Sequence, residues 1–310
     1  MKNVLRRLLA GKLTEDEAIA ELRRIQLDEL GGRAKLDLGR FLRRGIPEVV
    51  LATGKAPEDA ARLAVAMAER QGQGLISRMT AAHQAALHET ASAAGMQVIG
   101  YAASARVVRP AFEPEVSGGK VAILTAGTSD LPAAEEAQMV VEACGLEARL
   151  DADLGVAGLH RFVGPLAACL EWGADVIIVA AGMDGVLPGL VAGLIDVPVI
   201  GLPVSTGYGR GGAGEAALTT MLQSCSTGLV VVNIDNGVGA GAAAVLIAQR
   251  RFRGKNDATI ANINATTISK PTKNGKTARH TSGPPTSRKA KAPNTTPMPT
   301  HISSQGKPRR

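Results

Sequence analysis

The sequence predicts a doubly wound parallel α/β sheet preceded by a smaller, mainly helical region. Five runs with a strand-like, mainly apolar composition begin at Lys120, and each is followed by a segment with helical patterning. Runs that are apolar throughout are typical of parallel strands buried on both faces, which right-handed crossovers connect. The five runs are KVAILTAG, GLEARL, ADVIIVAAG, VPVIGLPV and GLVVVNID.

Composition supports the same fold class. Of the 310 residues, 45% are hydrophobic but only 2% are aromatic, so the core must consist of Ala, Val, Leu and Ile. Such small side chains, together with 36 glycines, suit helices that lie close to a parallel sheet. The length is sufficient for one large domain or two modest ones.

The region before the sheet, residues 1–115, has mainly helical patterning. Thr14 opens the stretch TEDE, which predicts a capping box, and Pro57 stands at the first position of a second predicted helix. A strand is predicted at residues 97–102. A Pro- and Gly-rich linker then leads into the α/β domain, to which we assign residues 116–250.

Basic residues are concentrated at the end of the chain. Residues 251–310 hold 13 Lys and Arg against one acidic residue, whereas the preceding 250 residues hold 22 basic and 27 acidic residues. This final segment has few apolar residues to bury, so we expect a disordered basic tail. Because no aromatic residue follows Phe252 for base stacking, a solvated tail is favoured over a polyanion-binding arm, and no nucleic-acid partner is expected.

The cysteines and the start of the chain indicate a cytoplasmic protein. Three scattered cysteines argue against a disulfide framework or a zinc site and favour a reducing compartment. The first residues lack the apolar core of about 7–15 residues that a secretory signal needs. No window reaches the roughly 18 uninterrupted apolar residues of a membrane span, so no membrane association is expected.

Ligands of such sheets bind beyond the carboxyl ends of the strands, and the first of these loops suits an anion. Gly127, Thr128, Ser129 and Asp130 stand there before a predicted helix. Hydroxyls and free backbone N–H groups at a helix start can bind a phosphate. The alternative is that Ser129 or Asp130 only caps the helix.

The next two loops offer acid–base groups. Asp153 follows the second run, and His160 lies in the first turn of the next helix. Such groups suit proton transfer or metal binding, although a turn Asp and a surface His are equally compatible with the pattern. Asp184 follows the third run, where burial would raise its pKa for proton transfer. The alternative for Asp184 is a residue of a β-turn.

The fourth and fifth loops are glycine-rich. Residues 203–218, which include Ser205 and Tyr208, suit a loop that encloses a phosphate, or simply a linker, and do not match a P-loop. The fifth loop supplies Asp235 and Asn236 before another helix. Together the five loops indicate a nucleotide or sugar-phosphate ligand, but they do not name the reaction.

Cys225, in the stretch MLQSCSTG, stands at the end of a predicted helix. The helix dipole at that end raises the pKa of a thiol, and the helix should run away from the other loops. From these residues alone, an inert buried cysteine is favoured over a nucleophile. Cys144 and Cys169 lie in helices at apolar spacings and are predicted to be part of the core.

Several long stretches resemble the LarB family. They are AGTSDLPAAEEA, LGVAGLHR, AAGMDGVLPGLVAGL with PVIGLPVSTGYG, and MLQSCSTG with VVNIDNGVGAG. The stretch AKLDLGRFLRRGIPEVVLATGK in the N-terminal region belongs to the same resemblance. Residues 120–250 are more distantly similar to the aminoimidazole ribonucleotide carboxylase/mutase fold of PurE, which implies a flavodoxin-like three-layer domain.

The LarB resemblance implies a pyridinium-3,5-biscarboxylic acid mononucleotide synthase, which acts in nickel-pincer nucleotide cofactor synthesis. Its substrate would be nicotinic acid adenine dinucleotide, carboxylated at C5 of the pyridinium ring with CO2 or bicarbonate as the co-substrate. Hydrolysis of the phosphoanhydride would release AMP. Mg2+ is the expected metal, with no ligands assigned to it.

The resemblance also implies roles for residues. Cys225 becomes the favoured nucleophile, and Asp153 and Asp184 become the acid–base carboxylates, although the family usually has Glu at the position of Asp184. The expected substrate-binding residues are Gly127, Thr128, Ser129, Asp130, His160, Ser205 and Tyr208. To reach the other loops, Cys225 needs an irregular helix or a neighbouring subunit, and the resemblance implies an even-numbered homo-oligomer such as an octamer.

Two other functions stay open. One is a purine-type aminoimidazole ribonucleotide carboxylase or mutase, for which a histidine would be expected near the AAGMDG loop, which has none. The other is a non-catalytic nucleotide-binding module.

Overall fold

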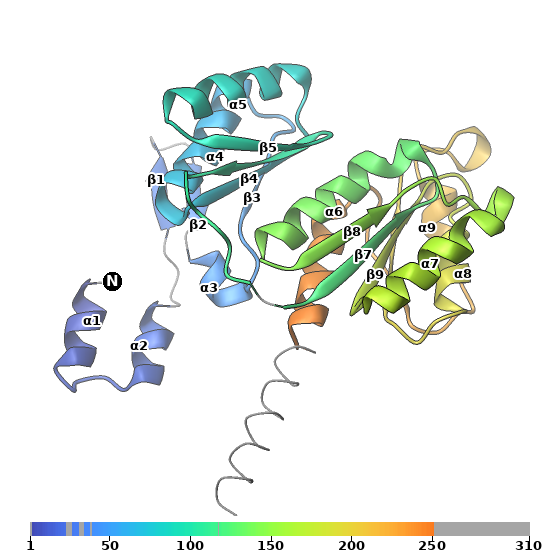
Figure 1. Cartoon of the computed structure of the whole chain (residues 1–310). Helices are drawn as coiled ribbons and strands as arrows, with labels where there is room; N and C mark the ends of the chain where they lie inside the picture. Colours follow the sequence, from blue (N-terminus) through green and yellow to red (C-terminus); the bar gives the residue numbers. More distant parts are fainter. Residues whose placement is uncertain (1, 23–26, 31–33, 38, 117, 251–310) are drawn as a thin grey trace, which may run out of the picture. The chain divides into compact units, whose positions relative to one another are not determined.

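The computed structural model describes residues 2–22, 27–30, 34–37, 39–116 and 118–250 (Figure 1). The tail predicted over residues 251–310 lies outside them, so its disorder stays a prediction. Within the described residues, no helix is both long and apolar enough to cross a lipid bilayer.

The sheet of the second domain is parallel throughout, as predicted. Its strand order, β8-β7-β9-β10-β11, is that of a flavodoxin-like sheet, in which the chain winds outward in both directions from a central strand. The strands are β7 (Lys120–Thr125), β8 (Glu147–Asp151), β9 (Val176–Ala181), β10 (Val199–Pro203) and β11 (Leu229–Val231).

The central strand β9 shows why the apolar runs fold as buried strands. All of its residues are buried. Val176, Ile178 and Ala180 belong to one hydrophobic core. Ile177 and Val179 belong to the core on the opposite face. Because the side chains of a strand alternate between faces, a strand covered on both sides requires an uninterrupted apolar run.

Helices cover both faces of this sheet. α6 (Leu131–Ala143) and a helix at residues 237–250 pack against one face. α7 (His160–Trp172), α8 (Leu187–Ala192) and α9 (Glu215–Leu222) pack against the other. This three-layer arrangement confirms the predicted fold class (Figure 1).

The N-terminal region contains helices, as predicted, and also two sheets. The helices are α1 (Lys2–Leu9), α2 (Glu15–Leu22), α3 (Arg40–Arg44), α4 (Pro57–Gln71) and α5 (Ala81–Ala93). Strands β1 (Leu27–Leu30) and β2 (Ala34–Asp37) form an antiparallel pair. A mixed sheet has the order β3-β4-β6-β5, with β3 (Val49–Leu51), β4 (Gln73–Ser77), β5 (Gln97–Tyr101) and β6 (Ser104–Val108).

The mixed sheet goes beyond the expectation from sequence, which places only β5 in this region. Buried polar residues interrupt the apolar pattern of its central strands: Gln73 and Ser77 in β4, and Ser104 and Arg106 in β6. The partners of Gln73, Ser77 and Arg106 are hydrogen-bonding groups on other elements, and a pattern of apolar residues does not reveal such partners.

Two local predictions are confirmed. The backbone N–H of Thr14 donates to Glu17 Oε2 at 2.8 Å, and the backbone N–H of Glu17 donates to Thr14 Oγ1 at 3.2 Å, which completes the capping box. The bond from the Thr14 backbone, more than any other contact, holds the pKa of the Glu17 carboxyl below its usual value. Pro57 is the first residue of α4, where a missing N–H leaves no hydrogen bond unmade.

Two glycines allow the helix at residues 237–250 to lie against α6. A Cβ atom at Gly237 would come within 2.3 Å of the carbonyl oxygen of Ala133, and one at Gly241 within 2.6 Å of that of Ala137. A spacing of four residues places both contacts on one face of each helix. The two backbones can therefore approach only because positions 237 and 241 carry no side chain.

The substitution Gly241→Ala should lower the free energy of unfolding by about 1–3 kcal/mol, because the added methyl group overlaps the backbone of α6. Helix propensity alone predicts the opposite sign, a gain of about 1 kcal/mol. Urea denaturation followed by circular dichroism measures the difference, and Gly241→Val should lose more. Stabilisation by alanine would contradict the close approach.

Candidate functional site

The carboxyl ends of β7 and β9 form the switch point of the sheet, where open α/β sheets bind ligands. Asp130, which follows β7, is only 3% exposed. Its Oδ2 accepts from the backbone N–H of Gly127 at 2.9 Å, and its Oδ1 accepts from the Thr206 hydroxyl at 2.8 Å. Asp130 therefore ties the loop after β7 to the loop after β10. Asp130 stands at the N-cap position of α6, but its side chain makes no capping bond to that helix. Its role in substrate binding stays a prediction.

The loop after β9 passes close to this bond. A Cβ atom at Gly182 would come within 2.3 Å of Thr206 Oγ1 and 3.2 Å of Asp130 Oδ1, so the position requires glycine. Thr128 and Ser129, on the turn that contains Asp130, are exposed. Their hydroxyls are accessible to a ligand at the switch point, and their role in binding stays a prediction.

Four loops at this edge hold a non-glycine residue with a left-handed backbone. These are Asp153 (φ 62°), Met183 (φ 44°), Ala213 (φ 57°) and Asp235 (φ 54°), which follow β8, β9, β10 and β11. The left-handed conformation costs about 1 kcal/mol or more for a residue with a Cβ atom. Retained backbone strain is typical of binding and catalytic sites, so this edge is the place to look for a ligand.

Asp153 and His160 lie at the outer end of the edge, after the outermost strand β8. Both are exposed, and the Asp153 carboxylate pairs with Arg161 at 3.0 Å. His160 is the first residue of α7, as predicted. Neither residue lines the two cavities described below.

Asp184 lies in a turn rather than at a buried strand end. Its side chain is exposed, and its Oδ1 accepts from the backbone N–H of Val186 at 3.4 Å, two residues further on. This is the local bond of an Asx-turn. The expectation that Asp184 is buried is wrong, because the chain leaves β9 at Ala181 and turns into solvent between Gly182 and Gly185.

A cavity of about 410 Å³ lies where the loops after β7, β10 and β11 face the turn after β4. The structure thus brings the predicted residues Ser129 and Ser205 together, while Tyr208 is 80% exposed and does not line this cavity. The polar residues in its lining include Ser129, Ser205, Thr206 and Asp235 from the second domain, and Arg78 and Ser104 from the N-terminal region.

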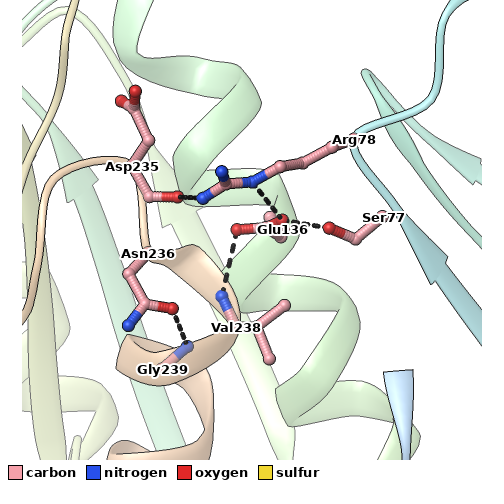
Figure 2. A network of polar contacts seen from close by, with 7 residues as sticks. All are labelled: Ser77, Arg78, Glu136, Asp235, Asn236, Val238 and Gly239. Carbon is pink, nitrogen blue, oxygen red and sulfur yellow. Dashed lines mark hydrogen bonds and ion pairs between the residues drawn. The ribbon is translucent and has the colours of Figure 1, made fainter. Parts of the chain in front are cut away.

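Glu136, on α6, also lines this cavity and is 4% exposed (Figure 2). Its carboxylate accepts from the Ser77 hydroxyl and, at 3.1 Å, from the backbone N–H of Val238. The Arg78 guanidinium lies 3.9 Å away. Val238 is in the first turn of the helix at residues 237–250, where free N–H groups favour a carboxylate. Glu136 therefore connects strand β4, helix α6 and this last helix.

Arg78 and Asp235 meet at the wall of the cavity (Figure 2). Arg78 follows β4 and has a left-handed backbone, with φ 56°. Its guanidinium donates to the carbonyl oxygen of Asp235 at 2.7 Å. Oδ1 of Asp235 accepts from the backbone N–H of Ser205 at 2.9 Å. Arg78 follows a strand of the mixed sheet and Asp235 follows a strand of the parallel sheet. The hydrogen bond between these two strained residues thus fixes the position of both.

A second set of polar contacts joins α6 to the mixed sheet. The Tyr101 hydroxyl donates to Glu142 at 2.5 Å, and Arg106 lies 4.0 Å from the same carboxylate and donates to Gln73 at 3.2 Å. Burial, and then the bond to Glu142, raises the pKa of Tyr101, so the phenol remains a donor. Buried polar groups need such partners, which Gln73 in β4 finds through its amide and Arg106 in β6 through its terminal nitrogen.

Cys225 is the one exposed cysteine of the three in the sequence. Cys144 and Cys169 are buried, as predicted. Burial raises the pKa of Cys144 to about 12 and that of Cys169 to about 11. Neither buried thiol can supply a thiolate at neutral pH, which leaves Cys225 as the nucleophile candidate.

Cys225 lies in a groove of about 470 Å³ between α8 and α9. Gly185, next to Asp184, is also part of the lining, as is Ser226, whose hydroxyl donates to the carbonyl oxygen of Gly189 at 2.7 Å. Helix α8 begins three residues after Asp184, and the Ser226 segment contacts the middle of that helix at Gly189.

Comparison with known proteins identifies the family. Residues 27–111 match the LarB/PurE-like N-terminal domain, and residues 120–266 match AIR carboxylase. An uncharacterized protein of Methanocaldococcus jannaschii is 38% identical over 255 residues, which is 80% of this chain and 98% of that protein. The chain belongs to the LarB family.

Other matches cover less than half of this LarB chain. The N5-carboxyaminoimidazole ribonucleotide mutase of Thermotoga maritima is 30% identical over 131 residues, which is 41% of this chain and 74% of the mutase. A crystal structure of a PurE variant from Treponema denticola is 20% identical with a TM-score of 0.34, and covers 49% of this chain and 99% of that one.

Three residues that shape the cavity of this LarB chain were not predicted from sequence: Arg78, Ser104 and Glu136. No motif marks Arg78 or Ser104. The signal for Glu136 is an acidic residue within the apolar helical stretch PAAEEAQMVV. A charged residue on a buried helix face indicates a partner elsewhere in the fold, although it does not name that partner.

Alkylation of the native LarB protein by iodoacetamide at neutral pH should be confined to Cys225, because the other two thiols are buried and have raised pKa values. In denaturant, all three cysteines should react. Intact-mass and peptide mass spectrometry measure the adducts, and Cys225→Ser should take up none while folded. An adduct on Cys144 or Cys169 of the folded protein would contradict the assignment.

Proposed function

We propose that this LarB protein carboxylates the pyridinium ring of nicotinic acid adenine dinucleotide at C5 with CO2 and hydrolyses the phosphoanhydride. The products are pyridinium-3,5-biscarboxylic acid mononucleotide, for nickel-pincer nucleotide cofactor synthesis, and AMP. The observation that carries the proposal is the single accessible thiol: Cys225 is exposed in a groove, whereas the other two cysteines are buried. Membership of the LarB family supports it.

The thiol gives the ring a reactivity that it lacks. A pyridinium ring is electron-poor and cannot attack CO2. When the Cys225 thiolate adds to C6, a C–S bond forms, the ring nitrogen loses its positive charge, and C5 becomes the nucleophilic end of a dienamine. C5 then forms a bond to the carbon of CO2. Loss of the C5 proton to a base and expulsion of the thiolate restore the aromatic ring and the free cysteine.

Two carboxylates are available for the proton transfers. Asp184, beside the switch point, and Asp153, after β8, are exposed in the single chain and can accept the C5 proton if the ring lies between them and the thiol. Asp184 is one methylene shorter than the Glu usual in the family, so the loop after β9 has to advance toward the ring. Met183, with its left-handed backbone, is part of that loop.

Exposed apolar side chains beside the groove favour a site shared between subunits. Gly185 and Cys225 line the same groove, but Asp184 itself does not line it. In this proposal the strand ends of a neighbouring subunit hold the dinucleotide and present its ring to Cys225. Exposed leucines near the groove support such a contact: Leu190 (37%), Leu194 (64%) and Leu222 (64%). The active form in this proposal is an even-numbered homo-oligomer such as an octamer.

The phosphates of the substrate lie at the switch point in this proposal, near Gly127, Thr128 and Ser129. Within the described part of the chain, no group of three or more His, Cys, Asp and Glu side chains could hold a metal ion. Mg2+ is usually bound by one or two carboxylates together with substrate phosphates. The described residues therefore fit Mg2+ that would arrive with the phosphates of the substrate and neutralise their charge, and no protein ligand is assigned to the ion.

Incubation of the protein with nicotinic acid adenine dinucleotide, bicarbonate and Mg2+ tests the reaction. Mass spectrometry should detect AMP and a mononucleotide with one added carboxyl group, and isotope-labelled bicarbonate should label that group. Substrate recovered unchanged in the presence of folded protein would refute the proposed activity.

Cys225→Ser should lower kcat by at least about 100-fold, because an alcohol is not ionised at neutral pH and does not add to the ring. Circular dichroism should show an unchanged fold, since the side chain is exposed. Cys169→Ala, which removes a buried thiol, is the control and should keep turnover within about threefold. Full turnover by Cys225→Ser would exclude the thiolate mechanism but not the reaction.

The match to AIR carboxylase and to mutase relatives favours one second candidate, a purine-type carboxylase or mutase. Turnover of aminoimidazole ribonucleotide or its N5-carboxy derivative, with none of the dinucleotide, would support it. Binding of the dinucleotide without any product would instead indicate a nucleotide-binding module.

A further inference from the structure

The cavity of about 410 Å³ beside α6 contains one carboxylate with an oxygen available to a ligand. The carboxylate of Glu136 is occupied by Ser77 and Val238 and lies beside Arg78. Asp235 uses Oδ1 to accept from the Ser205 backbone, and its Oδ2 has no hydrogen-bond partner among the residues that the structure describes. An ionised carboxylate only accepts hydrogen bonds, so its complement on a ligand is a hydroxyl or amino group, and not a phosphate.

Asp235 is held in a fixed position. Its backbone is left-handed, its carbonyl oxygen accepts from Arg78, and its side chain accepts from the loop after β10. A fixed acceptor at a strand end of an open α/β sheet is the arrangement that binds ribose hydroxyls in dinucleotide-binding folds. Arg78 acts here as a positioning residue, because its contact is to the Asp235 backbone.

The cavity has a polar end and shares two lining residues with a second cavity. At the switch-point end, the hydroxyl-bearing residues Ser129, Ser205 and Thr206 line it. In the other direction, Met79 and Ser104 are shared with a second cavity of about 200 Å³ in the N-terminal region. Leu87, His88, Val98 and Tyr101 are among the residues that line this second cavity. Apolar and aromatic side chains around a small space suit a planar base.

We propose that the two adjoining cavities bind the adenosine half of the dinucleotide, with Asp235 accepting from the ribose hydroxyls and the base beside Tyr101. The identity of the ligand rests on the proposed function. The phosphate end of the adenylate then points toward Ser129 and the switch point. The N-terminal domain contributes the base-binding walls, and the parallel sheet contributes the ribose and phosphate groups.

Binding of AMP, measured by calorimetry on the full chain, tests the ribose contact. Asp235→Asn retains the acceptor for the Ser205 backbone but presents an N–H group to the ribose. We expect AMP to bind about tenfold or more weakly, the effect of one unsatisfied polar group. Asp196→Asn, the same change at an exposed residue before β10, is the control and should bind AMP as the parent does.

A ligand without ribose hydroxyls completes a double-mutant cycle with the Asp235→Asn variant. 2′,3′-Dideoxy-AMP lacks both ribose hydroxyls, so it should bind the parent protein about tenfold or more weakly than AMP. Asp235→Asn should discriminate between the two ligands much less than the parent does, because its amide lacks the charge that strengthens a hydrogen bond from a hydroxyl. Equal binding of AMP by the parent and Asp235→Asn, or no AMP binding by the parent at millimolar concentration, would overturn the proposal.

The substitution Gly100→Val tests whether the adenine base binds in the second cavity. Gly100 lines the second cavity, and a Cβ atom there would meet no other atom within 4 Å, so valine fits strand β5. The variant should lose AMP binding by about tenfold or more while retaining nicotinate mononucleotide, as space for the base is filled. Unchanged AMP binding would show that the base does not bind in this cavity.

The binding data are independent of turnover. If Asp235 controls AMP affinity and no carboxylation occurs, the adenylate site stands and the proposed function falls. If carboxylation occurs and Asp235→Asn binds AMP normally, the function stands and the adenylate site falls.

Discussion

The buried carboxylate of Glu136 is the constraint on which the arrangement around the cavity depends. A buried carboxylate costs several kcal/mol unless other groups compensate it. Here the compensation comes from the Ser77 hydroxyl and the guanidinium of Arg78 at the end of β4, and from the Val238 backbone, so that two segments besides α6 take part. None of these segments can move away without leaving the charge unpaired. The position of the cavity wall therefore follows from the solvation of one side chain.

Helix α6 transmits this constraint in two directions. One face, through Ala133 and Ala137, lies against the glycine-containing helix at residues 237–250. Two further glutamates contact the mixed sheet: Glu135 accepts from the backbone N–H of Ala102 at 2.5 Å, and Glu142 accepts from the Tyr101 hydroxyl. Helix α6 thus packs on the parallel sheet through alanine and valine side chains, and it binds the mixed sheet through carboxylates.

The parallel sheet was predictable because each of its central strands is apolar on both faces, a property of contiguous residues. The mixed sheet was not, since its buried polar residues are matched by distant ones: Ser77 and Glu136 are 59 residues apart in the sequence. Arg78 and Asp235 are 157 residues apart.

The burial of Asp130 follows from a bond to Thr206 across two loops. Cys225, in contrast, lies in a short local stretch, and family resemblance rather than helix position pointed to it.

The left-handed residues at the strand ends lower the stability of the fold but keep the loops ordered. Glycine at these positions would relieve the steric strain of a Cβ atom, so selection for thermal stability alone would drive Met183 and Ala213 toward glycine. The loops would then sample more conformations and present their side chains less consistently. That these positions carry side chains means that the protein retains a less stable fold whose loops are ordered before the ligand arrives.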